Sequence, residues 1–179
     1  GGKPRRQRSR LRRVVVGIAV VVVLALVAST VFAVVTVRRP LPEHDGTQSV
    51  PGLSASVEVR RDAQGVPHVY ADDAEDLFRA QGYLQAQDRF FEMDYRRHVT
   101  SGRLAELVGD VPEAIQADKV IRTFGWRQVA EEEWHLVSDE TRAYLQAYAQ
   151  GVNSYLADRD PEELAVEYTV LGATVEVDQ

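Results

Sequence analysis

Hydrophobic and polar positions divide the chain into an apolar N-terminal run, a short irregular segment and a longer amphipathic part. Residues 14–37 form a run of 24 positions without a charged side chain, and most of them are Val, Ala, Leu or Ile. At ~1.5 Å per residue a helix of this run would be about 36 Å long, enough to cross a hydrocarbon layer of ~30 Å. The pattern predicts a transmembrane helix over residues 14–37.

Basic residues flank this run unevenly. Seven Lys or Arg lie in residues 1–13, whereas only Arg38 and Arg39 follow the run. Because the more positive flank stays in the cytoplasm, we expect a single-pass signal anchor in the cell membrane, with a cytoplasmic N-terminal tail and an extracytoplasmic main domain. The alternative is a cleavable signal peptide ending near Ala33, although the run is longer than a usual signal core.

Residues 38–56 show little periodicity and are rich in helix-breaking residues, among them Pro40, Pro42, Pro51 and Gly52. This composition is typical of a linker. The main domain is therefore expected over residues 57–179.

The main domain begins with the pattern of a β-hairpin. Val57–Arg60 alternates apolar with polar residues, as a half-buried strand does. Asp62–Gly65 has turn chemistry, and Val66–Tyr70 reads as the returning strand. Pro67 has no backbone N–H, so we expect it at an edge or at a strand start.

Helical patterns follow the hairpin. Asp72 and Asp73 are candidate N-caps of a long helix that ends near Gly102, and Asp76 has capping-box spacing from Asp73. The apolar face predicted for this helix comprises Leu77, Ala80, Leu84, Phe91 and Tyr95.

Shorter helical patterns complete the domain. We expect a helix over residues 103–108 closed by Gly109, another that begins at Pro112, and one over residues 139–157 capped by Ser138. The apolar side predicted for the last one comprises Tyr144, Leu145, Tyr148, Val152, Tyr155 and Leu156. The predicted fold class is α+β, a hairpin followed mainly by helices.

Charge and cysteine content restrict the functions available. After position 39 the chain has 12 Lys and Arg against 27 Asp and Glu, a net charge of −15. Phosphate binding needs clustered basic residues, so a nucleic-acid partner is not expected. The sequence has no Cys, which excludes disulfides and thiolate metal sites.

Several polar pairs suggest chemistry, each with a structural alternative. Asp88 and Arg89 resemble a charge relay, but an ion pair that fixes the helix is favoured. Arg89 with Arg96 and Arg97 also suggests a site for a carboxylate substrate. Asp94 and His98 lie four positions apart on one helix face, although two ligands do not make a metal site.

Aromatic and hydroxyl residues are also ambiguous. Tyr144, Tyr148 and Tyr155 recur at helical spacing and suggest the lining of an acyl pocket, but such stripes are more often core. None of the serines is expected to be catalytic. The internal serines considered are Ser49, Ser54, Ser56, Ser101, Ser138 and Ser154.

Taken in order, several short motifs over roughly residues 57–172 resemble the α chain of the penicillin acylase family of N-terminal-nucleophile (Ntn) hydrolases. The matching runs are Arg61–Ala71, Gly82–Met93, Ser101–Gly109, Tyr148–Asn153 and Glu167–Gly172, together with Asp118, Arg122 and Gly125. The positions that this resemblance marks as structural motif residues are Asp62, Gly65, Pro67, His68, Gly82, Asp88, Arg89, Gly102 and Gly109. After Gly172 the sequence departs from the family pattern, which usually has Pro and Trp there.

The resemblance implies a fold that this chain does not complete. In that family the α chain interleaves with a separate β chain around an αββα core, and the nucleophile is the first residue of the β chain. We therefore expect no catalytic, cofactor or metal residue in this chain, and a structural calcium only in the complete enzyme. Without its β chain, the part after residue 40 is expected to fold poorly.

The function that the resemblance implies is hydrolysis of an amide bond in an N-acylated small molecule. A β-lactam side chain, an N-acyl homoserine lactone and an acylated lipopeptide all remain open as substrates. The alternative is an inactive, acylase-like accessory or scaffold subunit of a larger membrane complex, because a transmembrane helix is unusual in this family.

Overall fold

The computed structural model describes residues 4–175, with side chains described from Arg12 onward, and the chain divides into two compact units after Arg39. The first unit is the helix α1 (Pro4–Arg38). Its part Arg12–Arg38 is 27 residues long and apolar enough to cross a membrane, with none of its most apolar stretch buried. The predicted span of residues 14–37 lies within it, whereas most of the basic tail of residues 1–13 has no described side chains.

The second unit begins with a two-stranded antiparallel sheet. Strand β1 (Glu58–Arg61) pairs with β2 (Pro67–Tyr70), with Glu58 opposite Tyr70 and Arg61 opposite Pro67. The predicted hairpin is confirmed, and Pro67 is the first residue of its strand, where a missing N–H is tolerated.

Helices make up most of the second unit. They are α2 (Ala74–Ser101), α3 (Leu104–Val108), α4 (Pro112–Phe124), α5 (Trp126–Glu133), α6 (Asp139–Leu156), α7 (Pro161–Leu164) and α8 (Val166–Leu171). Predicted caps are confirmed at three ends: Asp73 accepts bonds from the first turn of α2, Gly102 ends α2 with φ 67°, and Ser138 caps α6. The helices α5, α7 and α8 were not predicted.

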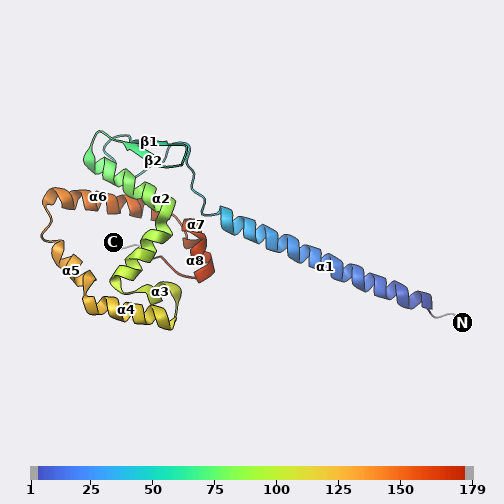
Figure 1. Cartoon of the computed structure of the whole chain (residues 1–179). Helices are drawn as coiled ribbons and strands as arrows, with labels where there is room; N and C mark the ends of the chain where they lie inside the picture. Colours follow the sequence, from blue (N-terminus) through green and yellow to red (C-terminus); the bar gives the residue numbers. More distant parts are fainter. Residues whose placement is uncertain (1–3, 176–179) are drawn as a thin grey trace. The chain divides into compact units, whose positions relative to one another are not determined.

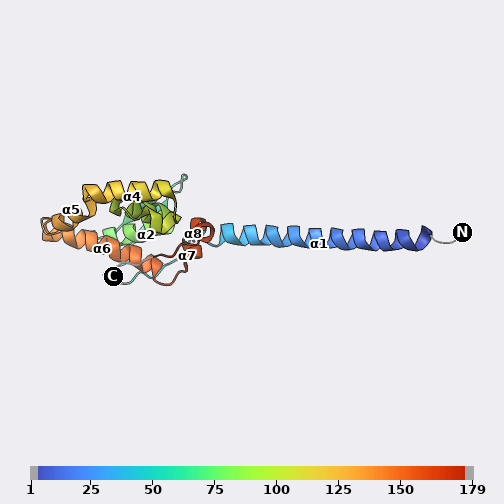
Figure 2. The same ribbon diagram turned by 90° about the horizontal axis from the view of Figure 1, so that it is seen from below.

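The long helices α2 and α6 cross in close contact, and α2 lies between α6 and α4 (Figure 1 and Figure 2). Two glycines permit the contact between α2 and α6. A Cβ atom at Gly82 would lie 2.1 Å from the carbonyl oxygen of Tyr148, and one at Gly151 would lie 1.9 Å from that of Arg79. A larger residue at either position would force the two helices apart at this crossing.

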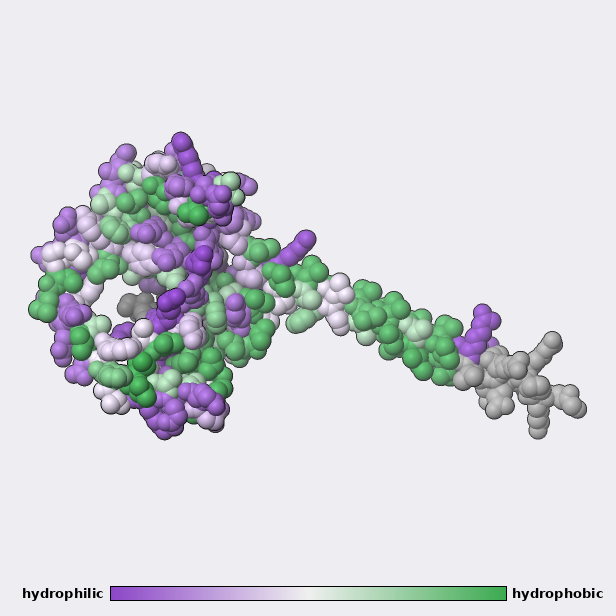
Figure 3. Space-filling model, in the orientation of Figure 1, coloured by the Kyte–Doolittle hydropathy of each residue, from purple (hydrophilic) through white to green (hydrophobic). Residues whose placement is uncertain are grey.

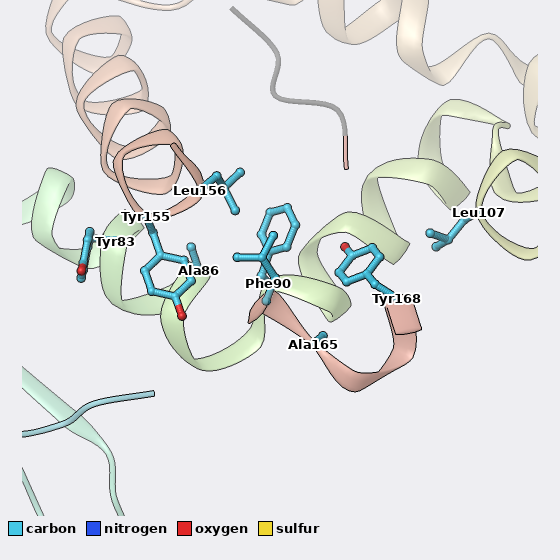
Figure 4. Packing of buried hydrophobic residues seen from close by; sticks show 9 residues of the cluster. Tyr83, Ala86, Phe90, Leu107, Tyr155, Leu156, Ala165 and Tyr168 are labelled. Carbon is cyan, nitrogen blue, oxygen red and sulfur yellow. The ribbon is translucent and has the colours of Figure 1, made fainter. Parts of the chain in front are cut away.

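The core forms where α2, α6 and the short C-terminal helices meet (Figure 4). Its buried residues are Tyr83, Ala86, Phe90, Leu107, Tyr155, Leu156, Leu164, Ala165 and Tyr168. The predicted apolar faces were partly wrong, because Tyr95 and Leu145 are 42% and 47% exposed. The face of α2 was misplaced because four of its buried positions are polar, namely Asp76, Gln87, Asp94 and His98.

Residues 40–56 contain no helix or strand, yet they contact the rest of the second unit. The side-chain amide of Gln87 donates to the carbonyl oxygen of Glu43 at 3.1 Å, and Val50 packs against the core. The backbone N–H groups of Ser54 and Ala55 donate to the carboxylate of Asp76. The compact unit therefore begins at Pro40, whereas the sequence predicted a linker up to residue 56.

Candidate functional site

The hairpin turn is held by one carboxylate. Asp62 Oδ1 accepts hydrogen bonds from the backbone N–H groups of Gln64 and Val66, both at 2.9 Å. The bond from Val66 is the main reason that the pKa of Asp62 lies below its usual value. Gly65 has φ 82°, a conformation that side-chain-bearing residues rarely adopt, and His68 Nε2 lies 3.4 Å from Asp62 Oδ2. These residues shape the turn.

A bidentate ion pair joins the hairpin to α2. Nη1 and Nη2 of Arg61 each donate to the carboxylate of Asp88 at 2.8 Å, and Nη1 also donates to the carbonyl oxygen of Gly65. The predicted pairing of Asp88 with Arg89 was wrong, because adjacent helix residues do not face each other. Arg89 is exposed instead, with Nη1 3.4 Å from Glu92 Oε2.

A kink in α2 lies beside this ion pair. Arg89 has non-helical backbone angles, φ −149° and ψ 33°, within the helix. A hollow of about 390 Å³ between the hairpin and α2 is lined by Pro67, Val69, Leu77, Gln81, Leu84, Gln85, Asp88 and Arg89. No Ser, Thr or Cys is among these lining residues. This lining therefore offers no hydroxyl or thiol to attack a carbonyl carbon.

A buried carboxylate organises the second half of α2. The side chain of Asp94 is fully buried and accepts hydrogen bonds from the hydroxyl of Tyr168 at 2.8 Å and from Arg97 Nη2 at 3.0 Å. His98 Nδ1 lies 3.2 Å from Asp94 Oδ1. Burial, and then the hydrogen bond to Asp94, raise the pKa of Tyr168 far above its usual value. The cluster ties α2 to α8.

The same cluster holds the candidate metal pair Asp94 and His98. The two side chains do lie together, but the carboxylate is engaged by Tyr168 and by the cationic Arg97, which would repel a metal ion. Among the described side chains, no three His, Asp or Glu are placed to hold a metal. The predicted carboxylate-binding arginines are likewise engaged, Arg97 with Asp94 and Arg96 with Glu92.

The three candidate tyrosines all pack toward α2. Tyr144 stacks on Phe78 with ring centroids 4.9 Å apart, and Tyr155 meets Tyr83 edge-on at 5.3 Å. The hydroxyl of Tyr148 donates to Gln85 Oε1 at 2.6 Å. Tyr148 also lines a hollow of about 260 Å³ between α2 and α6.

Four of the serines have local roles in the structure. Ser138 caps α6, while the hydroxyls of Ser101 and Ser154 donate to carbonyl oxygens in their own helices. The hydroxyl of Ser54 donates to Asp76 Oδ2 at 2.7 Å. Hydrogen bonds from Ser54 lower the pKa of Asp76, which makes that carboxylate a poor base.

Two structural carboxylates were not predicted in their observed roles. The backbone N–H of Asp76 donates to Asp73 as a capping box requires, but the Asp76 carboxylate binds residues 54–55 and does not return to Asp73. Asp118 lies in α4 and accepts hydrogen bonds from the backbone N–H groups of Leu104 and Ala105 at 2.7 and 2.9 Å, so it caps α3 from another helix. In the sequence, Asp118 was marked only by its position within the ordered series of motifs described above.

Comparison with known proteins shows to which family this chain belongs. Residues 56–178 match the family described as penicillin amidase. Penicillin acylase 2 proenzyme of Pseudomonas sp. is 42% identical over 139 residues, which are 78% of this chain and 17% of that protein. The acyl-homoserine lactone acylase QuiP of Pseudomonas aeruginosa is 38% identical over 128 residues, 70% of this chain and 15% of that protein.

A solved structure shows the same fold. The thermostable penicillin G acylase from Alcaligenes faecalis aligns with a TM-score of 0.60 and 35% sequence identity, over 68% of this chain and 64% of that chain. The chain spans about a sixth of the length of the two Pseudomonas proteins, and it matches the N-terminal, mostly helical region of acylases.

Proposed function

Because the chain belongs to the penicillin amidase family, we propose that it is the α-chain portion of a membrane-anchored, extracytoplasmic Ntn amidohydrolase. The observation that carries the proposal is the match of residues 56–178 to this family. Sequence identities of 42% to a penicillin acylase proenzyme and of 35% to a penicillin G acylase of known structure support it. The partner in this proposal is the β chain of the same precursor.

The reaction we propose takes place on the β chain. Its N-terminal Ser, Thr or Cys attacks the amide carbonyl carbon, while its own α-amino group, with a pKa of about 8, accepts the proton from the hydroxyl or thiol. Backbone and side-chain N–H donors stabilise the oxyanion. The amine leaves with a proton, and water then hydrolyses the acyl-enzyme to regenerate the nucleophile.

The contribution we propose for this chain is positional. Arg61 and Asp88 fix the hairpin on α2, and Gly82 and Gly151 fix α2 on α6. The described side chains contain carboxylates that are already engaged by hydrogen bonds, at Asp62, Asp76 and Asp88. Such groups hold a scaffold rigid, which catalytic positioning requires.

The substrate class we propose is an N-acylated small molecule. Relatives are named as penicillin acylases and as acyl-homoserine lactone acylases, so a β-lactam side chain and an N-acyl homoserine lactone are the first compounds to test. An acylated lipopeptide remains a third class.

The membrane attachment that we propose rests on α1. Its segment Arg12–Arg38 is long and apolar enough to span a bilayer, and seven basic residues lie in residues 1–13. A cytoplasmic N-terminus with an extracytoplasmic second unit follows from the positive-inside rule. A cleaved signal peptide is the alternative, and it predicts a mature N-terminus shortly after Ala33.

A structural calcium ion is a further proposal for the complete enzyme. Calcium prefers six to eight oxygen ligands. Among residues 12–175, no three acidic or His side chains converge on one point, so these residues do not fit a calcium site by themselves. Any such site needs ligands from outside this part of the chain.

An inactive accessory subunit of a larger membrane complex is the second candidate. The apolar helix Arg12–Arg38 favours it, because such a helix offers a surface for other membrane proteins. It predicts the same fold but a partner chain that does not begin with a nucleophile.

Expression of the complete precursor tests the proposal. Purified membranes should release carboxylic acid and amine from penicillin G or from an N-acyl homoserine lactone. Replacement of the first β-chain residue by Ala should abolish release and leave chain assembly intact. Activity that survives this replacement, or inactivity of the parent toward all three substrate classes, would reject an Ntn hydrolase acting on such amides.

A further inference from the structure

Helices α4 and α5 carry large apolar side chains that the described residues do not cover. Val120 and Phe124 on α4 are 53% and 63% exposed, and Trp126 and Val129 on α5 are 51% and 48% exposed. We call these four residues the α4–α5 apolar face. Figure 3 shows hydrophobic residues exposed over the α4 and α5 side of the second unit.

The four side chains form one continuous surface. Val120 and Phe124 are one helical turn apart on α4, and Trp126 and Val129 are neighbours at i, i+3 on α5. The rings of Phe124 and Trp126 stack with centroids 5.6 Å apart and planes at 14°, which joins the two helices across Gly125.

Helix α5 is amphipathic but buries nothing within the described residues. None of its residues is buried, while Arg127 and Glu131 form an ion pair of 2.7 Å on its polar side. A helix with one apolar and one charged side is stable in water when the apolar side is packed against another surface. The described residues do not provide this packing surface for α5.

We propose that the α4–α5 apolar face is covered by the β chain of the same precursor. This inference rests on the proposed two-chain function. The chain spans 17% of the length of its Pseudomonas relative, so most of a protein of that kind lies outside the structure and is available as the occupant. Contiguous exposed apolar residues are typical of such interfaces.

A lipid surface fits the face less well. Residues 40–179 have 12 Lys and Arg against 27 Asp and Glu, a net charge of −15, and Glu131, Glu132 and Glu133 follow the face on α5. Anionic headgroups repel such a domain, since basic clusters are what draws proteins to them. Charge therefore favours a protein occupant.

Photo-crosslinking on the complete precursor in its own membrane tests this inference. The photoreactive residue p-benzoylphenylalanine replaces Val129 in one variant and Gln128 in a matched control. Gln128 points away from the α4–α5 apolar face, because it is turned by about 200° from Trp126 and by about 100° from Val129 around the helix axis. After irradiation, mass spectrometry identifies what each position has captured.

The expected product at position 129 is a peptide of the β chain, with much lower yield at position 128. Capture of lipid, capture of a second copy of this chain, equal yields at both positions, or no product would each overturn the inference. In a parallel assay, Val129→Glu should lower the amount of β chain that copurifies by about tenfold, and Gln128→Glu should leave it unchanged.

Failure of this inference is distinguishable from failure of the proposed function. An inactive scaffold that keeps its second chain would still give the crosslink at position 129 but no amide hydrolysis. An active hydrolase without the crosslink would refute only the assignment of the α4–α5 apolar face.

Discussion

Replacement of Gly151 by Ala should separate the two helices that hold the second unit together. The added Cβ atom would lie 1.9 Å from the carbonyl oxygen of Arg79 and 3.0 Å from the backbone nitrogen of Tyr83. A carbon and an oxygen in contact need about 3.3 Å, so α6 would have to move away from α2 by more than ~1 Å. No rotamer relieves the clash, because the obstacle is backbone.

Two opposing effects determine the size of the change. Ala in place of Gly favours the helix by about 0.5–1 kcal/mol. Overpacking in a core costs about 1–3 kcal/mol, occasionally more, and a backbone obstacle places this site at the upper end. We therefore expect a net loss of about 2 kcal/mol or more in the free energy of unfolding.

Chemical denaturation of the complete processed protein measures this loss. Gly151→Ala should lower the denaturation midpoint clearly, and Gly82→Ala should do the same, because its Cβ would lie 2.1 Å from the carbonyl oxygen of Tyr148. The control Gln146→Ala, at an exposed position of α6, should remain within about 0.5 kcal/mol of the parent. A Gly151→Ala protein as stable as the parent would show that α2 and α6 do not cross here.

Three further predictions concern single contacts and the membrane segment. The pKa of Asp76 is lowered by its bonds to Ser54, so its stabilising effect is present above its unfolded pKa of 3.8 and is lost as pH falls through its lower folded pKa. Acid titration of stability below pH ~4 should therefore be shallower for Asp76→Asn than for the parent, and identical slopes would contradict the assignment. Tyr168→Phe should destabilise the fold by about 1–3 kcal/mol in urea denaturation, because it leaves the buried Asp94 with one donor fewer; a change below about 0.5 kcal/mol, the scatter of surface substitutions, would mean that water replaces the hydroxyl. Deletion of residues 1–39 should move the protein from the membrane to the soluble fraction, provided that the parent sediments with membranes; a parent that is already soluble would favour a cleaved signal peptide.

Local features of the fold followed from the sequence because their causes are local. Asp73, Gly102 and Ser138 were assigned as caps from residue type and position alone, and all three serve in that role. Cap chemistry involves only neighbouring backbone groups, so one turn of sequence is enough to predict it.

The buried residues were predicted less well from the sequence, because burial depends on segments that are distant along the chain. The side chain of Asp94 is fully buried and accepts a hydrogen bond from the hydroxyl of Tyr168, 74 positions away in the sequence. Because Asp94 is charged, the hydropathy pattern did not assign it to the buried face of α2. Tyr95, the neighbouring aromatic residue, was assigned to the core but is exposed. Hydropathy periodicity misplaces a helix face when polar groups are buried in pairs.

The partner of Asp88 was missed for a related reason. The sequence places Arg89 beside it, yet the bidentate partner is Arg61 from the hairpin, 27 positions earlier. The kink at Arg89 was equally invisible in the sequence, because α2 contains no Pro there. Tertiary ion pairs and kinks need the packed structure.

N-terminal sequencing with intact-mass analysis of the purified native protein tests the central claim most directly. The account predicts two chains from one precursor, of which the second and larger begins with Ser, Thr or Cys. A precursor that remains uncut, or a second chain that begins with a residue unable to attack a carbonyl carbon, would contradict the hydrolase and favour the accessory subunit.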